Sequence, residues 1–236
     1  MSQEHNSSNT EEKHKWFPLE SNPDLVNDYV RKLGYSQAYE FVDVFSTEEW
    51  ALEMIAQPVQ AVLLLYPLTD VQNAHQDPPE NIVKESSDIW FIKQRIGNAC
   101  GTIALLHALL NGPAELLVPD SWLAQFAQAT QTLSSIERAQ KLEQDQQIAQ
   151  HHDRATSSEQ NATTRGSLDD DIITHFVALM AVNGKLYELD GRKEGPVCHG
   201  PCQNLLVDAC ALVQKFMARD PNEVRFTIMA LAPKEL

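Results

Sequence analysis

The sequence predicts a fold of the α/β (α+β) class in one domain, and two segments of different periodicity carry this prediction. Residues 22–34 show an apolar stripe at helical spacing, which begins after a capping asparagine and ends at a glycine. Residues 173–192 instead hold two apolar runs joined by Asn183-Gly184, the pattern of a two-residue β-hairpin. No long linker interrupts the 236 residues, of which 43% are hydrophobic, so the chain can bury a sizeable core.

Local patterns then define the elements of the first half of the chain. Residues 1–15 are almost wholly polar, and we expect them to form a flexible tail before a single domain at 16–236. The run VQAVLLLY at 59–66 is apolar enough to predict a central strand. The other elements expected in this half are strands at 40–45 and 89–94, a helix at 47–56 and a surface loop at 67–87.

In the second half, an apolar helix is expected to begin near Cys100 and to end at Asn111-Gly112-Pro113, which is a strong helix terminator. Residues 151–171 have no apolar period and predict a long loop, a kind of segment that is usually functional or disordered. The other expected elements are helices at 120–130, 134–150 and 204–218 and a final strand at 223–232.

The composition argues against several classes of function. A formal net charge of −15 disfavours binding to nucleic acid or to anionic membranes and suits a basic partner. The N-terminus has no apolar core like that of a signal peptide, and the longest apolar runs are too short to span a bilayer. Four cysteines in a chain of this length do not indicate a disulfide scaffold, so we expect a cytoplasmic protein, with the nucleus as a further compartment.

Neither a cofactor nor a metal is expected. Cys198, His199, Cys202 and Cys210 are metal-binding residue types, but their spacing matches no common zinc pattern. The pair at 151–152 consists of histidines within the predicted loop, where we expect solvated side chains.

The predicted hairpin brings an imidazole and a carboxylate together. A two-residue Asn-Gly turn pairs Val182 with Lys185, which places Asp190 opposite Val177. Because side chains two residues apart on a strand share a face, His175 becomes a diagonal neighbour of Asp190, within side-chain reach. A carboxylate in this position can fix the tautomer of a histidine and stabilise its charged form.

Cys100 is a candidate nucleophile, because a thiol at the start of a helix has a lowered pKa. His175 could take the thiol proton, and Asp190 could orient His175. The Gln94 side-chain amide and the Cys100 backbone N–H could stabilise an oxyanion. Each residue also has a structural explanation: a core cysteine, a histidine with structural hydrogen bonds, an aspartate in a turn. The residues alone leave both explanations open.

A resemblance favours the catalytic explanation. The segment QRIGNACGTIALLHALLN at 94–111 is similar to the ubiquitin C-terminal hydrolase family of thiol peptidases, in particular its short, single-domain members. The likeness extends from Trp16 to Ala232 through PLESNP, FVDVF, AVLLLYP, HFVAL, LYELDGRK and KFMARDPNEVRF, in the order of the family. It implies that Cys100 is the nucleophile, His175 the general base and acid, Asp190 the orienting acid and Gln94 the oxyanion-hole donor.

The resemblance also implies a particular architecture. We expect a papain-like core with a six-stranded, mainly antiparallel sheet between helices, and a knotted backbone, which ordinary topology rules would not suggest. The loop at 151–171 corresponds to the family's crossover loop, which passes over the active site and would limit the size of the leaving group.

Ubiquitin is the partner that the resemblance implies, and a close ubiquitin-like modifier remains open. By family position, Glu20, Asp43 and Glu223 would contact its arginine-bearing tail, although ordinary solvated carboxylates would look the same in the sequence. The expected activity is hydrolysis of small adducts or short peptides from the C-terminal glycine of ubiquitin by a monomer. An idle module that only holds free ubiquitin is the alternative, but it would not need Gln94, Cys100, His175 and Asp190 together.

Overall fold

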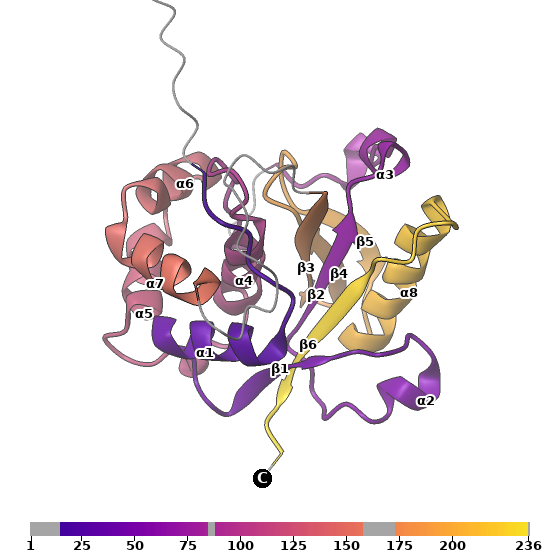
Figure 1. Ribbon diagram of the computed structural model, residues 1–236, viewed down its shortest axis with the longest axis horizontal. Helices are drawn as coiled ribbons and strands as arrows, with labels where there is room; N and C mark the ends of the chain where they lie inside the picture. The colour runs from indigo at the N-terminus through magenta and orange to yellow at the C-terminus, as the bar shows by residue number, and fades with distance from the viewer. Residues whose placement is uncertain (1–14, 85–87, 158–172, 236) are drawn as a thin grey trace, which may run out of the picture.

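Six antiparallel strands form one twisted sheet in the computed structural model, which describes residues 15–84, 88–157 and 173–235 (Figure 1). Their spatial order is β1-β6-β2-β3-β4-β5, so β2 and β3 are central and the N-terminal strand lies at one edge. The strands are β1 (Tyr39–Asp43), β2 (Ala61–Pro67), β3 (Thr174–Val182), β4 (Lys185–Leu189), β5 (Val197–Pro201) and β6 (Thr227–Pro233). The mixed class and the antiparallel six-stranded sheet are therefore confirmed.

Helices cover both faces of this sheet (Figure 1). Alternate residues of a strand point to opposite faces, so β3 contributes Phe176 and Ala178 to one core and Val177 and Leu179 to the other. One core packs against α1 (Pro23–Leu33), α4 (Cys100–Leu110), α5 (Trp122–Thr130), α6 (Ser135–Glu143) and α7 (Gln146–Thr156), and the other packs against α2 (Glu49–Leu52) and α8 (Leu205–Arg219).

The caps foreseen from the sequence explain where α1 begins and ends. Asn22 accepts hydrogen bonds from the N–H groups of Asp24 and Leu25, and Gly34 takes the left-handed conformation at a φ of 105°. Asn27 of the same helix bonds both backbone groups of Phe41, at 2.9 and 2.7 Å, so the outer edge of β1 is occupied there by a side chain.

Residues 89–94 are not a strand, which corrects the expectation for this segment. Side chains from helices bond its backbone groups in place of a neighbouring strand. Asn111 bonds the N–H and C=O of Trp90 at 2.7 and 2.8 Å. His107 Nε2 accepts from the N–H of Ile92 at 3.1 Å. No described strand pairs with this segment through a ladder of backbone hydrogen bonds.

Several helical segments and the last strand also differ from expectation. The helix expected at 134–150 is two helices, because Asp145 caps the start of α7 through its side chain. The loop expected at 67–87 contains α3 (Asp70–Ala74) and a short 3₁₀ turn (Pro79–Asn81), and a second such turn spans Ala114–Leu116. The helix expected at 47–56 is a single turn, α2, and the last strand begins at Thr227 rather than at 223.

The loop expected at 151–171 is wrong over its first six residues, which continue α7 to Thr156. Its remainder from 158 on, like the predicted tail at 1–14, lies outside the described residues. The knotted backbone stays a prediction from the resemblance. Among the described residues, no helix has the length and apolar character needed to cross a membrane.

Candidate active site

Cys100 is the first residue of α4, a helix that is buried on nearly all sides between the sheet and α7. The residue before it, Ala99, has no side chain that could cap the helix, so the N–H groups of the first turn stay available. The backbone N–H groups of Gly101 and Phe176 lower the pKa of the Cys100 thiol. The thiol therefore lies where backbone dipoles favour its negative form.

The hairpin has the register expected from its turn. Val182 pairs with Lys185 and Ala178 with Leu189, which puts Asp190 directly after the last paired residue of β4. Asn183 and Gly184 have φ angles of 50° and 71°, the positive values that a tight turn of this type requires. The prediction that turn chemistry would bring His175 beside Asp190 is confirmed.

Cys100, His175 and Asp190 form a hydrogen-bonded chain. His175 Nε2 lies 2.7 Å from Asp190 Oδ1, and both residues are 3% exposed. The imidazole also bonds the Cys100 thiol, for which its other ring nitrogen, Nδ1, is left. The three side chains come from α4, β3 and the turn after β4, and all three are buried.

The electrostatics of this chain favour a thiolate beside an imidazolium. Burial raises the pKa of Cys100, but the hydrogen bond and the charge of His175, with the two backbone N–H groups, outweigh it and leave that pKa below its ordinary value. Burial lowers the pKa of His175, yet the Asp190 carboxylate and the Cys100 sulfur raise it to about 9. The pKa of Asp190 is lowered, because its bonds to His175 and to the Arg192 N–H outweigh its burial.

Tyr66 is a site residue that the sequence did not indicate. It lies directly opposite His175 on β2, and its ring meets the imidazole edge-on with centroids 5.9 Å apart. Burial and the charges of Asp190 and Glu188 raise the pKa of its phenol. No local pattern could have identified this contact, because it depends on the pairing of two strands more than a hundred residues apart.

Gln94 is held next to the turn that carries Asp190. Its backbone N–H donates to the Gly191 carbonyl at 2.8 Å, and its side-chain Nε2 donates to the Ile96 carbonyl at 3.3 Å. The side-chain Oε1 is buried and accepts no hydrogen bond from the described residues. An unpaired acceptor cannot bind an oxyanion, but Nε2 carries two N–H groups and only one of them donates to Ile96, so the second is left to donate to a bound oxygen.

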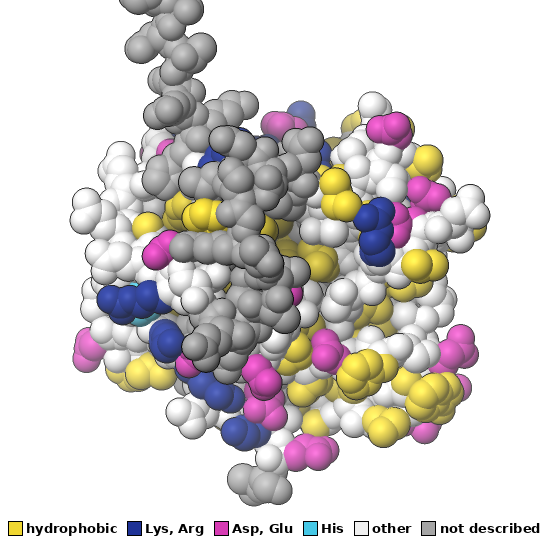
Figure 2. Space-filling view, in the orientation of Figure 1, with side chains coloured by type: hydrophobic (Ala, Val, Ile, Leu, Met, Phe, Trp, Pro, Cys, Tyr) yellow, Lys and Arg dark blue, Asp and Glu magenta, His cyan; other side chains and the backbone are white. Residues whose placement is uncertain are grey.

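The three acids expected to meet a basic tail lie on three separate segments. Glu20 is half-buried just before α1, and Asp43 ends β1 beside a groove of about 390 Å³ that Phe45 and Trp50 also line. Burial and the charge of Asp24 raise the pKa of Asp43. Acidic side chains gather over β1 and β6 on this face (Figure 2). Contact with a partner stays a prediction for all three.

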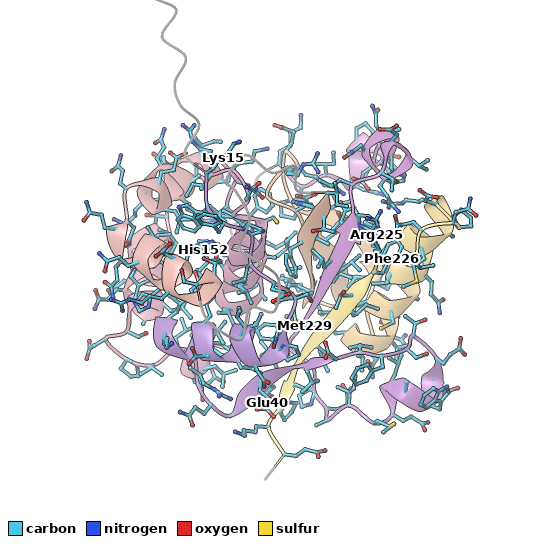
Figure 3. The ribbon with its side chains drawn as sticks, viewed as in Figure 1. Lys15, Glu40, His152, Arg225, Phe226 and Met229 are labelled. Carbon is cyan, nitrogen blue, oxygen red and sulfur yellow. The ribbon has the colours of Figure 1, made fainter. Side chains whose placement is uncertain are left out.

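The charge of Glu223 is already paired with an arginine of its own chain. Arg225 Nε and Nη2 lie 2.9 and 2.5 Å from its two carboxylate oxygens, and this pairing lowers the pKa of Glu223 to about 2. Figure 3 shows Arg225 and Phe226 in the segment that leads into β6. A basic ligand would therefore have to compete with Arg225 for this carboxylate.

His152 is not a solvated loop residue, which corrects the expectation for it. Figure 3 shows it between α7 and α4, and it is 2% exposed. Its Nε2 donates to the Phe17 carbonyl at 2.7 Å, and its Nδ1 lies 2.9 Å from Oγ1 of Thr102, two residues after the candidate nucleophile. It ties α7 and the N-terminal segment to the start of α4.

One group of potential metal ligands occurs among the described residues, and it does not involve the cysteines. Asp77, Glu188 and His199 have ligand atoms within 4.8 Å of one another. The ammonium of Lys193 lies 2.6 Å from Asp77 Oδ2 and 2.5 Å from Glu188 Oε1, in the place that a cation would take. All four cysteines are free. Burial is the main cause that raises the pKa of Cys202 and of Cys210 to about 11.

Comparisons with known proteins bear on the family of this chain. A family model described as ubiquitin carboxyl-terminal hydrolase, family 1, matches residues 16–218. The chain is 39% identical over 223 residues to a ubiquitin carboxyl-terminal hydrolase of Drosophila melanogaster, covering 92% of this chain and 96% of the fly protein. It is 40% identical over 227 residues to ubiquitin carboxyl-terminal hydrolase 3 of Arabidopsis thaliana, covering 93% and 95%.

A solved structure shares the fold. It is the catalytic domain of Trichinella spiralis UCH37 bound to ubiquitin vinyl methyl ester, with a TM-score of 0.76 and 22% sequence identity. The match covers 94% of this chain and 97% of that one.

Proposed function

The chain belongs to ubiquitin carboxyl-terminal hydrolase family 1, and we propose that it cleaves small adducts and short peptides from the C-terminal glycine of ubiquitin. The observation that carries this function is the buried chain of hydrogen bonds from Cys100 through His175 to Asp190. A cysteine whose pKa is lowered by a histidine, itself oriented by a carboxylate, is the arrangement of an acyl-transfer thiol enzyme.

The reaction follows from the positions of these groups. The Cys100 thiolate attacks the carbonyl carbon of the terminal glycine, and its oxygen takes the negative charge. The Gln94 side-chain amide and the Cys100 backbone N–H donate hydrogen bonds to that oxygen. His175 then gives its proton to the leaving group, which departs and leaves a thioester on Cys100. His175 next removes a proton from water, and the resulting attack on the thioester releases ubiquitin with a free carboxylate.

Ubiquitin is the partner because the family and the charge of the chain both suit it. Its tail carries arginines, and a chain with a net charge of −15 attracts such a segment. Glu20, Asp43 and Glu223 are the acids that would meet the tail, and Glu223 would do so by exchanging Arg225 for an arginine of ubiquitin.

An idle ubiquitin-binding module is not favoured. A protein that only binds ubiquitin gains no affinity from a buried imidazole, carboxylate and thiol held together. Their burial also costs the desolvation of three ionisable groups. A binder would retain its affinity without any of them.

The test is covalent capture by ubiquitin that carries a thiol-reactive electrophile at its C-terminus. We expect one adduct by mass, located at Cys100 by peptide mapping and absent in Cys100→Ala. Cys202 and Cys210 are internal controls, because their pKa of about 11 leaves them protonated at neutral pH. Capture at another cysteine, or binding of ubiquitin without capture, would reject the proposal.

A further inference from the structure

A second charged cluster lies on the same face of the sheet as His175 and Asp190. Its centre is Glu188 of β4, two residues before Asp190. The Glu188 side chain is fully buried. Lys193 Nζ lies 2.5 Å from Glu188 Oε1 and 2.6 Å from Asp77 Oδ2, and His199 Nε2 lies 3.0 Å from Glu188 Oε2. The cluster thus joins the turn after β4 to β4 itself, to β5 and to the loop after α3.

Two carboxylates and a histidine are ligand types that suit a divalent metal, but the cluster already contains its cation. Burial lowers the pKa of Lys193, and the charges and hydrogen bonds of Glu188 and Asp77 outweigh this effect and raise it. Lys193 is therefore charged at neutral pH. An ammonium between both carboxylates excludes a second cation, so the cluster has another role.

Lys193 belongs to the same tight turn as Asp190. Its backbone N–H donates to the Asp190 carbonyl at 3.0 Å, and the next N–H toward the triad, that of Arg192, donates to Asp190 Oδ1 at 2.8 Å. From the opposite side, Lys93 Nζ donates to the Lys193 carbonyl at 2.6 Å. Lys193 thus fastens, through its side chain, the turn whose backbone sets the direction of the Asp190 carboxylate.

We propose that Lys193 is a positioning residue of the active site, which holds the 190–193 turn against Glu188 and Asp77 and so keeps Asp190 aimed at His175. The inference rests on the proposed roles of Cys100, His175 and Asp190. Lys193 touches none of the reacting atoms and acts only through Asp190. Without it, the turn keeps its backbone bonds but loses its attachment to the sheet face.

Alkylation of Cys100 by iodoacetamide, measured as a function of pH, tests this inference without ubiquitin. In Lys193→Met, a less well-aimed Asp190 stabilises the imidazolium less, so the midpoint of thiolate formation should rise by about one pH unit. With a ubiquitin substrate, kcat should fall about 10- to 100-fold, as expected for a misplaced catalytic group, and KM should change little. Lys193→Arg, which keeps a half-buried cation at this position, should restore most of the alkylation midpoint and of kcat.

The matched control is Arg138→Met. Arg138 is also a nearly buried cation, and it donates to the carbonyls of Phe91, Thr130 and Gln131 without contacting the triad. Its loss should lower the midpoint of urea unfolding without moving the alkylation midpoint. The other charged groups around Lys193 are unchanged in every variant. They are His75, Lys93, Arg192, Glu194, His199 and Arg219.

If Lys193→Met does not fold, the double variant Lys193→Met/Glu188→Gln removes the unpaired buried charge at Glu188 and should show the same shift. An unmoved alkylation midpoint in whichever Lys193 variant folds would make Lys193 a residue of fold stability only and would overturn the inference. A wild-type midpoint in the range of an ordinary cysteine would instead reject the proposed function, so the two failures are distinct.

Discussion

At the scale of single residues, the active site depends on the placement of ionised groups where water hardly reaches. A buried thiolate or a buried imidazolium alone would be strongly disfavoured. The negative sulfur of Cys100 and the positive imidazole of His175 offset each other's cost of burial. Asp190 adds the negative charge that keeps the imidazole protonated. Asp190 in turn remains ionised at 3% exposure mainly through His175, with further contributions from the Arg192 N–H and the nearby Lys193 charge.

The directions of these pKa values predict a bell-shaped pH dependence of kcat/KM. Activity should rise with pH as Cys100 loses its proton, below the ordinary pKa of a cysteine, because the thiolate is the nucleophile. It should fall again near pH 9, where His175 loses the proton that the leaving group needs. Initial rates with a fluorogenic ubiquitin amide would measure both limbs. A flat rate from pH 8 to 10 would contradict the assigned role of the His175 proton.

Substitutions of His175 and Asp190 should differ in severity. His175→Ala should lower kcat by at least about 10²–10⁴-fold, the usual contribution of a positioned general base. Asp190→Asn should cost less, because Asp190 touches only the imidazole and acts through it. Steady-state kinetics would measure both, and the affinity for ubiquitin, measured by calorimetry with Cys100→Ala as the reference, should stay nearly constant. An equal or larger loss in Asp190→Asn would show a direct role for the carboxylate.

At the scale of elements, the site depends on two tight turns of different character. Gly184 lies in the hairpin turn at a φ of 71°, with no atom within 4 Å of an added Cβ. Gly191 follows Asp190, and a Cβ there would lie 2.8 Å from Ile103 Cγ2 and 2.9 Å from Gln94 Cβ. The first glycine is needed for backbone conformation and the second for a close approach between two catalytic segments.

The same substitution should therefore have different effects at these two glycines. Gly184→Ala should lower the free energy of unfolding by about 1–2 kcal/mol, the cost of a left-handed conformation, and leave kcat unchanged. Gly191→Ala should lower kcat, because Gln94 must move away from the turn that holds Asp190. Urea unfolding and turnover of a ubiquitin amide, measured on both variants, would separate the effects. Unchanged kcat in Gly191→Ala would show that this close approach does not position Gln94.

The elements also show what the sequence can and cannot predict. The hairpin was predictable to the residue, because Asn183-Gly184 and the period of two are local signals that agree. The structure of residues 89–94 was not predictable. Their backbone is hydrogen-bonded by Asn111 and His107, which are too far away in the sequence to appear in a local pattern. His152 was missed because it occupies an apolar position of an amphipathic helix, between Ile148 and Ala155, where a histidine is not counted as core.

The candidate site shows the same division. Its His175–Asp190 half follows from one turn, and the place of Cys100 follows from a helix start. The approach of α4 to β3 and the contact of Tyr66 with His175 depend on pairings between distant segments. The same is true of the Lys193 cluster, which joins the 190–193 turn to Asp77. Such contacts are set by the packing of the whole chain and have no counterpart in local periodicity.

At the scale of the whole molecule, the net negative charge of the chain affects the rate at which a basic substrate associates with it. The chain carries 33 acidic and 18 basic side chains, and its acids gather over β1 and β6 on the face shown in Figure 2. Such a surface attracts a basic tail over roughly one Debye length, about 10 Å at 0.1 M salt, and the attraction acts on encounter more than on chemistry.

We therefore expect salt to lower kcat/KM for a ubiquitin amide and to spare kcat. Raising the ionic strength from about 0.05 to about 0.5 M should reduce kcat/KM about tenfold, in line with electrostatic steering. Alkylation of Cys100 by neutral iodoacetamide should hardly respond, because no charged tail is recruited. Asp43→Asn should weaken the salt dependence, whereas Glu223→Gln should change it little, since Arg225 already neutralises that carboxylate. An equal effect of the two substitutions on the salt dependence would mean that ubiquitin displaces Arg225 from Glu223. A kcat/KM of the wild type that does not change with salt would show that electrostatic steering does not contribute to binding.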